Sequence, residues 1–207
     1  MEGAALAQIT ATRLYSIEEY LRLEDKAVEK SEYKNGKIIN MAGGTVPHNV
    51  ISANFIREIG NAIIAQNKPC VVASGDMKIY MPAYQFFNYS DGLVFCGEPQ
   101  FYNNTTDSLI NPTLIVEVSS DSTEVYDRTD KFDEYCSLDS FQEYIIASQK
   151  QMRVEVWTKQ EGEKWIVQLY NKPTDKIKLR SIDCELDINR VYFGVTVKKA
   201  ERPPSVI

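Results

Sequence analysis

The chain has 207 residues, of which 43% are hydrophobic and 25% charged, and its formal net charge is −6 at pH 7. This length suits one domain with a sizeable core, and this composition excludes an intrinsically disordered chain. The acidic balance argues against a protein that coats nucleic acid, but it is compatible with an enzyme that meets nucleic acid through one local basic surface.

Membrane and secreted proteins are also disfavoured. No apolar stretch approaches the roughly 20 residues that a membrane-spanning helix needs, and residues 1–7 lack the basic start and long apolar core of a signal peptide, so we expect neither. The four cysteines lie far apart, and together with a single histidine they exclude a zinc finger. We expect Cys70 and Cys96 to be small core residues of a reduced, cytoplasmic protein.

The first third of the chain carries local signals for a helix, a hairpin and a second helix. Residues 1–13 show no hydrophobic period, and we expect a loose tail followed by a single domain of residues 14–207. Ser16 and Glu19 have capping-box spacing, which predicts a helix to about residue 24. The Asn35-Gly36 pair predicts a β-hairpin, and Pro47 suits the first turn of a helix to about residue 66.

Strands dominate the remainder of the chain. A helix of about fifteen residues is predicted to begin at Asp121, with Val125, Phe132, Tyr135 and Cys136 as its buried stripe. The predicted strands cover residues 70–73, 77–81, 89–96, 112–119, 143–147, 153–157 and 165–169, the last two forming a hairpin across Glu161-Gly162.

Two carboxylates stand alone in apolar strands. Glu117 lies within Pro112–Ser119, and Asp91 opens the run that ends at Cys96. An isolated buried acid costs several kcal/mol unless a cation or hydrogen-bond donors compensate it. If the two strands are antiparallel neighbours, the start of one lies beside the end of the other, and the carboxylates converge. Such a pair suits a hard divalent cation.

Lys131 is the third candidate, because its predicted helix directly follows the Glu117 strand. A lysine beside metal-bound carboxylates can orient water or stabilise charge on a phosphorane-like transition state, while the metal polarises the phosphate. Simpler interpretations exist for all three residues. Glu117 could pair with an arginine, Asp91 could be a turn residue, and Lys131 could be an exposed lysine paired with Asp127.

The order of these elements and residues resembles the PD-(D/E)XK nuclease superfamily, and the chain is similar to the Uma-two (Uma2) family of restriction-endonuclease-like proteins over about residues 15–195. The resemblance implies an α/β (α+β) fold with a restriction-endonuclease-like core, in which helices flank a central mixed sheet, and a C-terminal β-hairpin extension. It rests on the segments Glu32–Gly36, Pro47–Asn49, Ser74–Lys78, Tyr89–Asp91, Asn111–Val118 and Tyr126–Lys131.

The resemblance also implies roles for single residues. Asp91 and Glu117 match the ligands of Mg²⁺ or Mn²⁺, and Lys131 matches the catalytic lysine, because the usual position two residues after the glutamate is Ser119 here. One departure is Ser90, which stands where the family pattern has proline before the aspartate, and Gly92 follows the aspartate. We expect this departure to loosen the strand entry but to leave the carboxylate in place.

Three further residues are possible members of the site. Glu32 fills the position of an additional acid, although a hairpin carboxylate in solvent is the simpler interpretation. His48 is either an ordinary polar residue in the first turn of a helix or a contact to a phosphate or a ligating carboxylate. Gln149 follows the strand of residues 143–147 and is a possible neighbour of the site.

These observations predict a metal-dependent endonuclease that hydrolyses phosphodiester bonds of DNA. A homodimer is expected as well, because the ribbon that carries Trp157 and Trp165 has apolar surface to spare. The alternative is a catalytically weak or inactive nuclease-like module that binds DNA or forms a dimer through residues 153–180. The acidic balance weighs against DNA cleavage, whereas the presence of all three polar site residues weighs against a purely structural dimer.

Overall fold

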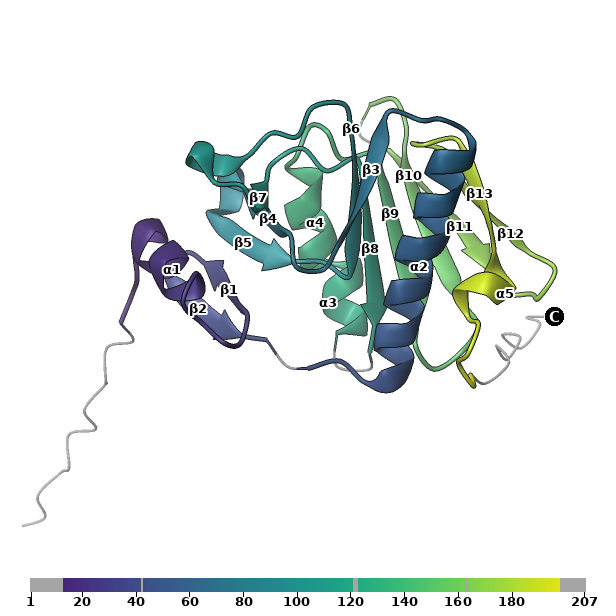
Figure 1. Ribbon diagram of the computed structural model, residues 1–207, viewed down its shortest axis with the longest axis horizontal. Helices are drawn as coiled ribbons and strands as arrows, with labels where there is room; N and C mark the ends of the chain where they lie inside the picture. Colours follow the sequence, from purple (N-terminus) through teal and green to yellow (C-terminus); the bar gives the residue numbers. More distant parts are fainter. Residues whose placement is uncertain (1–12, 42, 121–122, 163, 198–207) are drawn as a thin grey trace, which may run out of the picture.

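The computed structural model describes residues 13–41, 43–120, 123–162 and 164–197 (Figure 1). The predicted loose tail of residues 1–13 therefore lies, apart from Arg13, outside the described residues, as does the expected helix start at Asp121. None of the helices in the described ranges is long and apolar enough to cross a membrane.

A six-stranded mixed sheet forms the centre of the fold. Its neighbours are antiparallel except for the parallel pair β8–β9, so the predicted mixed sheet is confirmed. In spatial order the strands are β11 (Trp165–Tyr170), β10 (Val154–Lys159), β9 (Glu143–Ser148), β8 (Leu114–Ser119), β6 (Gly92–Cys96) and β3 (Cys70–Ser74).

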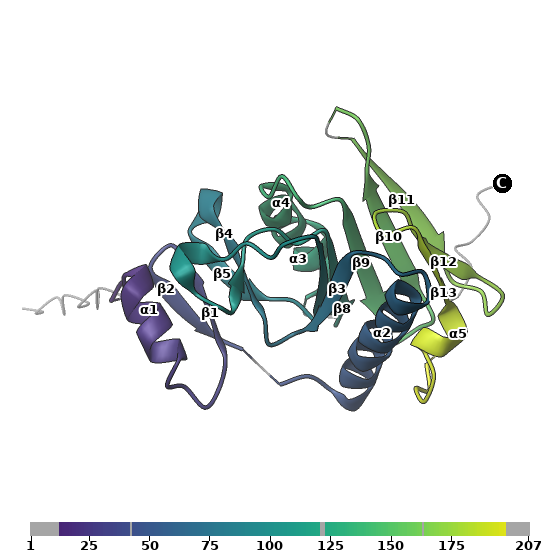
Figure 2. The same cartoon turned by 45° about the horizontal axis from the view of Figure 1, so that its top comes forward.

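Alternation along β8 divides its side chains between two cores. Val116 packs with Phe55 of α2 (Val46–Ala65), whereas Ile115 packs with Tyr135 of α4 (Asp130–Cys136) on the other face. Figure 2 shows α2 on one side of the sheet and α3 (Glu124–Arg128) and α4 on the opposite side. Helices therefore flank the sheet on both faces, as expected.

A second sheet lies beside the first and is built from short strands. Tyr20 packs against Tyr33 and Phe87 of this sheet, and the centroids of the three rings lie 5.1 to 6.2 Å apart. Its strands are β2 (Lys37–Asn40), β1 (Ser31–Lys34), β5 (Phe86–Tyr89), β4 (Lys78–Met81) and β7 (Ser108–Leu109), with α1 (Ile17–Glu24) and the 3₁₀ turns Pro82–Tyr84 and Tyr102–Asn104 nearby.

The local predictions for the first third of the chain are confirmed. The Oγ of Ser16 accepts from the backbone N–H of Glu19 at 3.2 Å, and the Glu19 carboxylate accepts from the backbone N–H of Ser16 at 3.0 Å, which closes the capping box of α1. Asn35 and Gly36 have φ values of 48° and 84°, as a two-residue hairpin turn requires.

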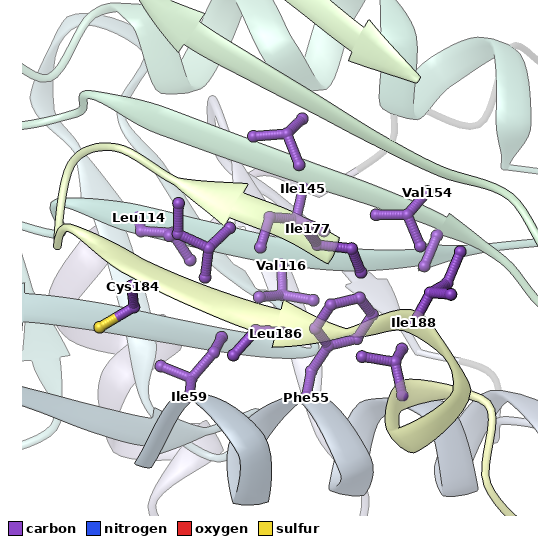
Figure 3. Close-up of a cluster of buried hydrophobic side chains, with 14 of the residues drawn as sticks. Phe55, Ile59, Leu114, Val116, Ile145, Val154, Ile177, Cys184, Leu186 and Ile188 are labelled. Atoms are coloured by element: carbon purple, nitrogen blue, oxygen red, sulfur yellow. The ribbon is translucent and has the colours of Figure 1, made fainter. Parts of the chain in front are cut away.

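The end of the described chain forms a small ribbon that the sequence analysis did not predict. β12 (Lys176–Leu179) pairs with β13 (Cys184–Asp187) and leads into α5 (Ile188–Val191). Figure 3 shows Ile177, Leu186 and Ile188 among the side chains that fill the space between the central sheet and α2. The ribbon therefore completes the core on this face.

The helix predicted after the Glu117 strand is not continuous. It divides into α3 and α4 at Thr129, where φ is −122° and ψ is −99°. The hydroxyl of Thr129 donates to the carbonyl of Val125 at 2.8 Å, a side-chain bond that competes with the helical backbone pattern. Val125 is 75% exposed, so its assignment to the buried stripe was wrong, whereas Tyr135 is fully buried.

Cys70 and Cys96 also differ from expectation. They face each other across β3 and β6 and are joined by a disulfide. Both are partly buried and pack against the hydrophobic core, as expected, but the prediction that they are reduced is wrong. The predicted cytoplasmic location therefore loses the support that it drew from reduced cysteines. Cys184 is a buried free thiol.

Candidate active site

A cleft of about 710 Å³ lies between the start of α2, strand β1 of the second sheet and the adjoining ends of β6 and β8. Its lining includes every residue that the sequence analysis selected: Glu32, His48, Asp91, Glu117, Lys131 and Gln149. The structure thus brings together side chains that come from six separate parts of the chain.

The register of β6 and β8 explains why Asp91 and Glu117 meet. The strands are antiparallel with Gly92 opposite Val116, which places Asp91 beside the end of β8. The N–H of Asp91 donates to the Val116 carbonyl at 3.1 Å, and the N–H of Val118 donates to Oδ2 of Asp91 at 2.7 Å. The Asp91 carboxylate is therefore held against the backbone that carries Glu117.

The departure from the family pattern at Ser90 does not loosen this strand entry. Ser90 is buried, and its hydroxyl donates to the carbonyl of Gly92 at 3.2 Å. A Cβ on Gly75 would lie only 2.7 Å from the Ser90 carbonyl oxygen, so glycine is needed for the turn after β3 to approach so closely. Packing on both sides therefore fixes the backbone before Asp91.

Glu117 is 5% exposed and has two donors on one oxygen. The ammonium of Lys131 lies 2.8 Å from Oε1, and the hydroxyl of Tyr135 donates to the same atom at 2.7 Å. Burial raises the pKa of Glu117 to about 8; Lys131 opposes this rise, and the negative charge of Asp91 adds to it. The cation that pairs with Glu117 is Lys131, so the alternative that Glu117 forms a structural ion pair with an arginine is wrong.

Lys131 is buried, which contradicts its interpretation as an exposed helical lysine. Burial acts to lower the pKa of its ammonium group, but the negative charges of Glu117, Glu32 and Asp127 outweigh this and raise the pKa above its ordinary value. Lys131 therefore keeps its positive charge inside the cleft, among several carboxylates.

His48 contacts the second carboxylate. Its Nε2 lies 3.2 Å from Oδ2 of Asp91, and the two side chains are 22% and 18% exposed. The hydrogen bond to Asp91 raises the pKa of His48, the charges of Asp91 and Glu117 add to this, and burial opposes it. The α2 N-cap, Thr45, accepts from the N–H of His48 at 3.3 Å, which fixes the turn that carries the imidazole.

Glu32 and Gln149 reach the cleft from opposite sides. Glu32 is half-buried in β1, and burial raises the pKa of its carboxyl group, against the opposing charge of Lys131. It is therefore not a fully solvated hairpin residue. Gln149 hydrogen-bonds Thr45 through its side chain, and its N–H donates to the Ser119 carbonyl at 3.4 Å, so it joins the end of β9 to the start of α2.

Sequence reasoning missed three residues next to this site. Asp127 is 3% exposed, and burial raises its pKa while Lys131 opposes the rise. Tyr135 was assigned to a buried stripe but not to the site, and Asn88, which donates to the Tyr135 hydroxyl at 2.8 Å, was not considered. The four-residue spacing between Lys131 and Tyr135, which puts them on one helix face, was the available signal.

The donor chemistry of Asp91 and Glu117 fits a divalent cation. Both offer carboxylate oxygens, and Mg²⁺ commonly binds one or two carboxylates and completes its coordination with water. Within the described residues, no group of three or more His, Cys, Asp or Glu side chains could hold a metal ion, so water and carbonyl oxygens would supply the other ligands. A cation would relieve the repulsion by which Asp91 raises the pKa of Glu117.

Comparison with known proteins places this site in context. Residues 17–189 match the model of the Uma2 family, which is described as "Putative restriction endonuclease". Two similar proteins of Synechocystis sp. are described as "Uncharacterized protein sll1609" and "Uncharacterized protein slr1290". The first is 32% identical over 163 residues, covering 77% of this chain and 89% of its own length. The second is 32% identical over 180 residues, covering 87% and 92%.

A solved structure shares the fold. It is the crystal structure of "a putative nuclease belonging to DUF820" from Anabaena variabilis, with a TM-score of 0.64 and 18% sequence identity. The match covers 84% of this chain and 96% of that one. The mixed sheet with flanking helices is therefore the architecture of a restriction-endonuclease-like protein, as the sequence predicted.

Proposed function

We propose that this chain, which belongs to the Uma2 family of restriction-endonuclease-like proteins, is an endonuclease that hydrolyses DNA phosphodiester bonds with the help of Mg²⁺ or Mn²⁺. The observation that supports this most is the meeting of Asp91, Glu117 and Lys131 in one cleft, with the ammonium of Lys131 2.8 Å from the Glu117 carboxylate. Two acids and a lysine that line one cleft are suited to metal-assisted phosphodiester hydrolysis.

The protein's own side chains would divide the work. Asp91 and Glu117 would hold the cation, and His48 and the N–H of Val118 would keep the Asp91 carboxylate oriented. A bound divalent cation supplies a Lewis acid for the scissile phosphate and lowers the pKa of water. The ammonium of Lys131 would orient the attacking water or stabilise negative charge that develops on the phosphate.

The charges that line the cleft support dependence on a cation. Lysines 30 and 131 face five carboxylates: Glu32, Asp76, Asp91, Glu117 and Asp127. A cleft with this excess of acids repels phosphate in the absence of metal. A divalent cation between the carboxylates would offset most of this negative charge and let the DNA backbone approach.

The same acidic lining also favours a second candidate function. A nuclease-like module that has little or no turnover could keep the buried Glu117–Lys131 pair as a structural contact and bind DNA elsewhere, or associate with a second copy of the chain. We propose a homodimer for both candidate functions. β11 is an edge strand with exposed apolar side chains, and this feature does not depend on whether the chain cleaves DNA.

Nicking of supercoiled plasmid with Mg²⁺ or Mn²⁺ tests the endonuclease. The parent should nick the plasmid, and Asp91→Asn and Glu117→Gln should each reduce the rate by about 10²-fold or more. Asp139→Asn, which changes an exposed acid outside the cleft, should match the parent and controls for contaminating nucleases. Calorimetry that detects Mn²⁺ binding by a parent without nicking activity would favour the binding module.

A further inference from the structure

Tyr135 lies in the middle of a buried hydrogen-bond chain that ends at Glu117. Its hydroxyl donates to Oε1 of Glu117 at 2.7 Å and accepts from Nδ2 of Asn88 at 2.8 Å. Tyr135 and Asn88 are fully buried. The chain joins three elements, because Asn88 belongs to β5 of the second sheet, Tyr135 to α4 and Glu117 to β8 of the central sheet.

The direction of this chain follows from proton counting. A phenol has one proton to donate, and the nitrogen of a side-chain amide can only donate, so a tyrosine oxygen that meets such a nitrogen accepts there and keeps its own proton for another partner. The amide of Asn88 supplies that nitrogen, and it thereby directs the Tyr135 proton towards Glu117. Hydrophobic packing alone would not require a buried amide at this position, because phenylalanine and leucine fill such space without polar atoms.

The two oxygens of Glu117 have different surroundings. Lys131 and Tyr135 lie four residues apart on one face of α4, and both contact Oε1. Within the described part of the chain, the structure records no hydrogen bond to Oε2. Glu117 also lines the cleft. One oxygen is thus held by the protein, and the other is left for the contents of the cleft.

We propose that Tyr135, oriented by Asn88, is a positioning residue that holds Oε1 of Glu117 so that Oε2 is presented to the divalent cation. This inference rests on the proposed function, because it assumes that Glu117 binds a cation. A carboxylate that is held at one oxygen loses less rotational freedom when it binds metal. Partners of this kind commonly change metal affinity by roughly 10-fold to 100-fold when they are removed.

Calorimetric titration with Mn²⁺ tests the role of Tyr135. Tyr135→Phe should weaken Mn²⁺ binding by about 10-fold or more. Tyr170→Phe removes another largely buried hydroxyl, which accepts from the N–H of Lys178 far from the cleft, and should leave the affinity unchanged. Tyr135→Phe loses two hydrogen bonds and Tyr170→Phe loses one, so the melting temperatures of both variants without metal are compared as well. A loss of Mn²⁺ affinity confined to Tyr135→Phe separates positioning from general stability.

Asn88→Ala adds a second test. It should weaken Mn²⁺ binding in the parent but add little in the Tyr135→Phe background, because both residues act through one hydroxyl. If Tyr135→Phe does not fold, Asn88→Ala compared with Tyr170→Phe decides the question. Equal affinities of parent, Tyr135→Phe and Asn88→Ala would overturn this inference alone. A parent that binds no Mn²⁺ would overturn the proposed function and the inference with it.

Discussion

The ammonium of Lys131 lies 2.8 Å from Oε1 of Glu117, and both side chains are more than nine-tenths buried. Removal of one member of such a pair leaves an uncompensated charge in a medium that solvates it poorly. The pair does not neutralise the cleft, because Asp91 and Asp127 also act on Glu117. The metal-free site therefore carries electrostatic strain that pH and cations should change measurably.

Glu117→Gln should alter the pH dependence of stability in the metal-free protein. The pKa of Glu117 is raised from 4.5 to about 8 by burial, so the folded state holds this proton more tightly than the unfolded state. Between these two values the free energy of unfolding of the parent should fall as pH rises, by at most about 1.4 kcal/mol per pH unit. Lys131 does not titrate in this window, because its pKa is raised.

Urea unfolding in the presence of a chelator measures this effect between about pH 5 and about pH 8. The parent should lose stability relative to Glu117→Gln as the pH rises, and Asp139→Asn should follow the parent. Parallel curves for parent and Glu117→Gln would show that Glu117 titrates at its ordinary pKa.

Mn²⁺ should stabilise the folded chain through Asp91 and Glu117. A ligand that binds only the folded state raises the free energy of unfolding by about 2.7 kcal/mol at a hundredfold excess over Kd. Because the metal requires the ionised form of Glu117, stabilisation should increase as pH rises towards the pKa of about 8. Thermal melting with and without Mn²⁺ gives the measurement.

The comparison variants for Mn²⁺ are Asp91→Asn and Glu117→Gln. Asp91→Asn keeps an oxygen that can accept from the N–H of Val118, so the strand contact persists while a ligand charge is lost. Neither variant should gain stability from Mn²⁺. A parent whose melting curve does not move on addition of millimolar Mn²⁺ would refute the metal site.

Much of the fold could be predicted because its signals are local. The capping box at Ser16 and the Asn35-Gly36 turn act within a few residues, and the alternation of β8 separates Val116 from Glu117. The meeting of Asp91 and Glu117 could be predicted from the assumption that their strands are antiparallel neighbours, which the register confirms.

The parts that were missed depend on distant contacts. β5 is buried at every position and therefore shows no two-residue period. Asn88 gains its place beside Tyr135 only when the second sheet packs against α4, and nothing near Asn88 in the sequence signals this. The break at Thr129 depends on a side-chain bond to the backbone that many helical threonines also make without a break.

The protein should be a homodimer that pairs through β11. Trp157 and Trp165 do not supply spare surface, because both pack against Phe132. The exposed apolar residues of β11 are instead Ile166, Val167 and Leu169, at 47%, 48% and 50%. β11 is an edge strand that pairs only with β10 within the described residues, and such an edge readily pairs with a second copy about a two-fold axis.

Light scattering at micromolar concentration should give twice the 23.6 kDa mass of one chain. Val167→Lys places a charge at the middle of the edge and should shift the protein towards monomer. Val28→Lys changes a fully exposed valine outside the ribbon and should leave the dimer intact. A parent that scatters as a single chain would refute the dimer.

Lys131→Gln should separate an enzyme from a binding module. The glutamine retains an amide donor for Oε1 of Glu117, so Mn²⁺ affinity should change little, but the positive charge beside the phosphate is lost and nicking should fall by about 10²-fold or more. Lys131→Arg should not restore activity, because a guanidinium is too broad for a buried site that holds a compact ammonium.

Lys178→Gln, at an exposed position of β12, is the matched control. Equal nicking rates for parent, Lys131→Gln and Lys178→Gln would remove Lys131 from the mechanism. Bound Mn²⁺ without nicking by any of the three would instead favour the binding module.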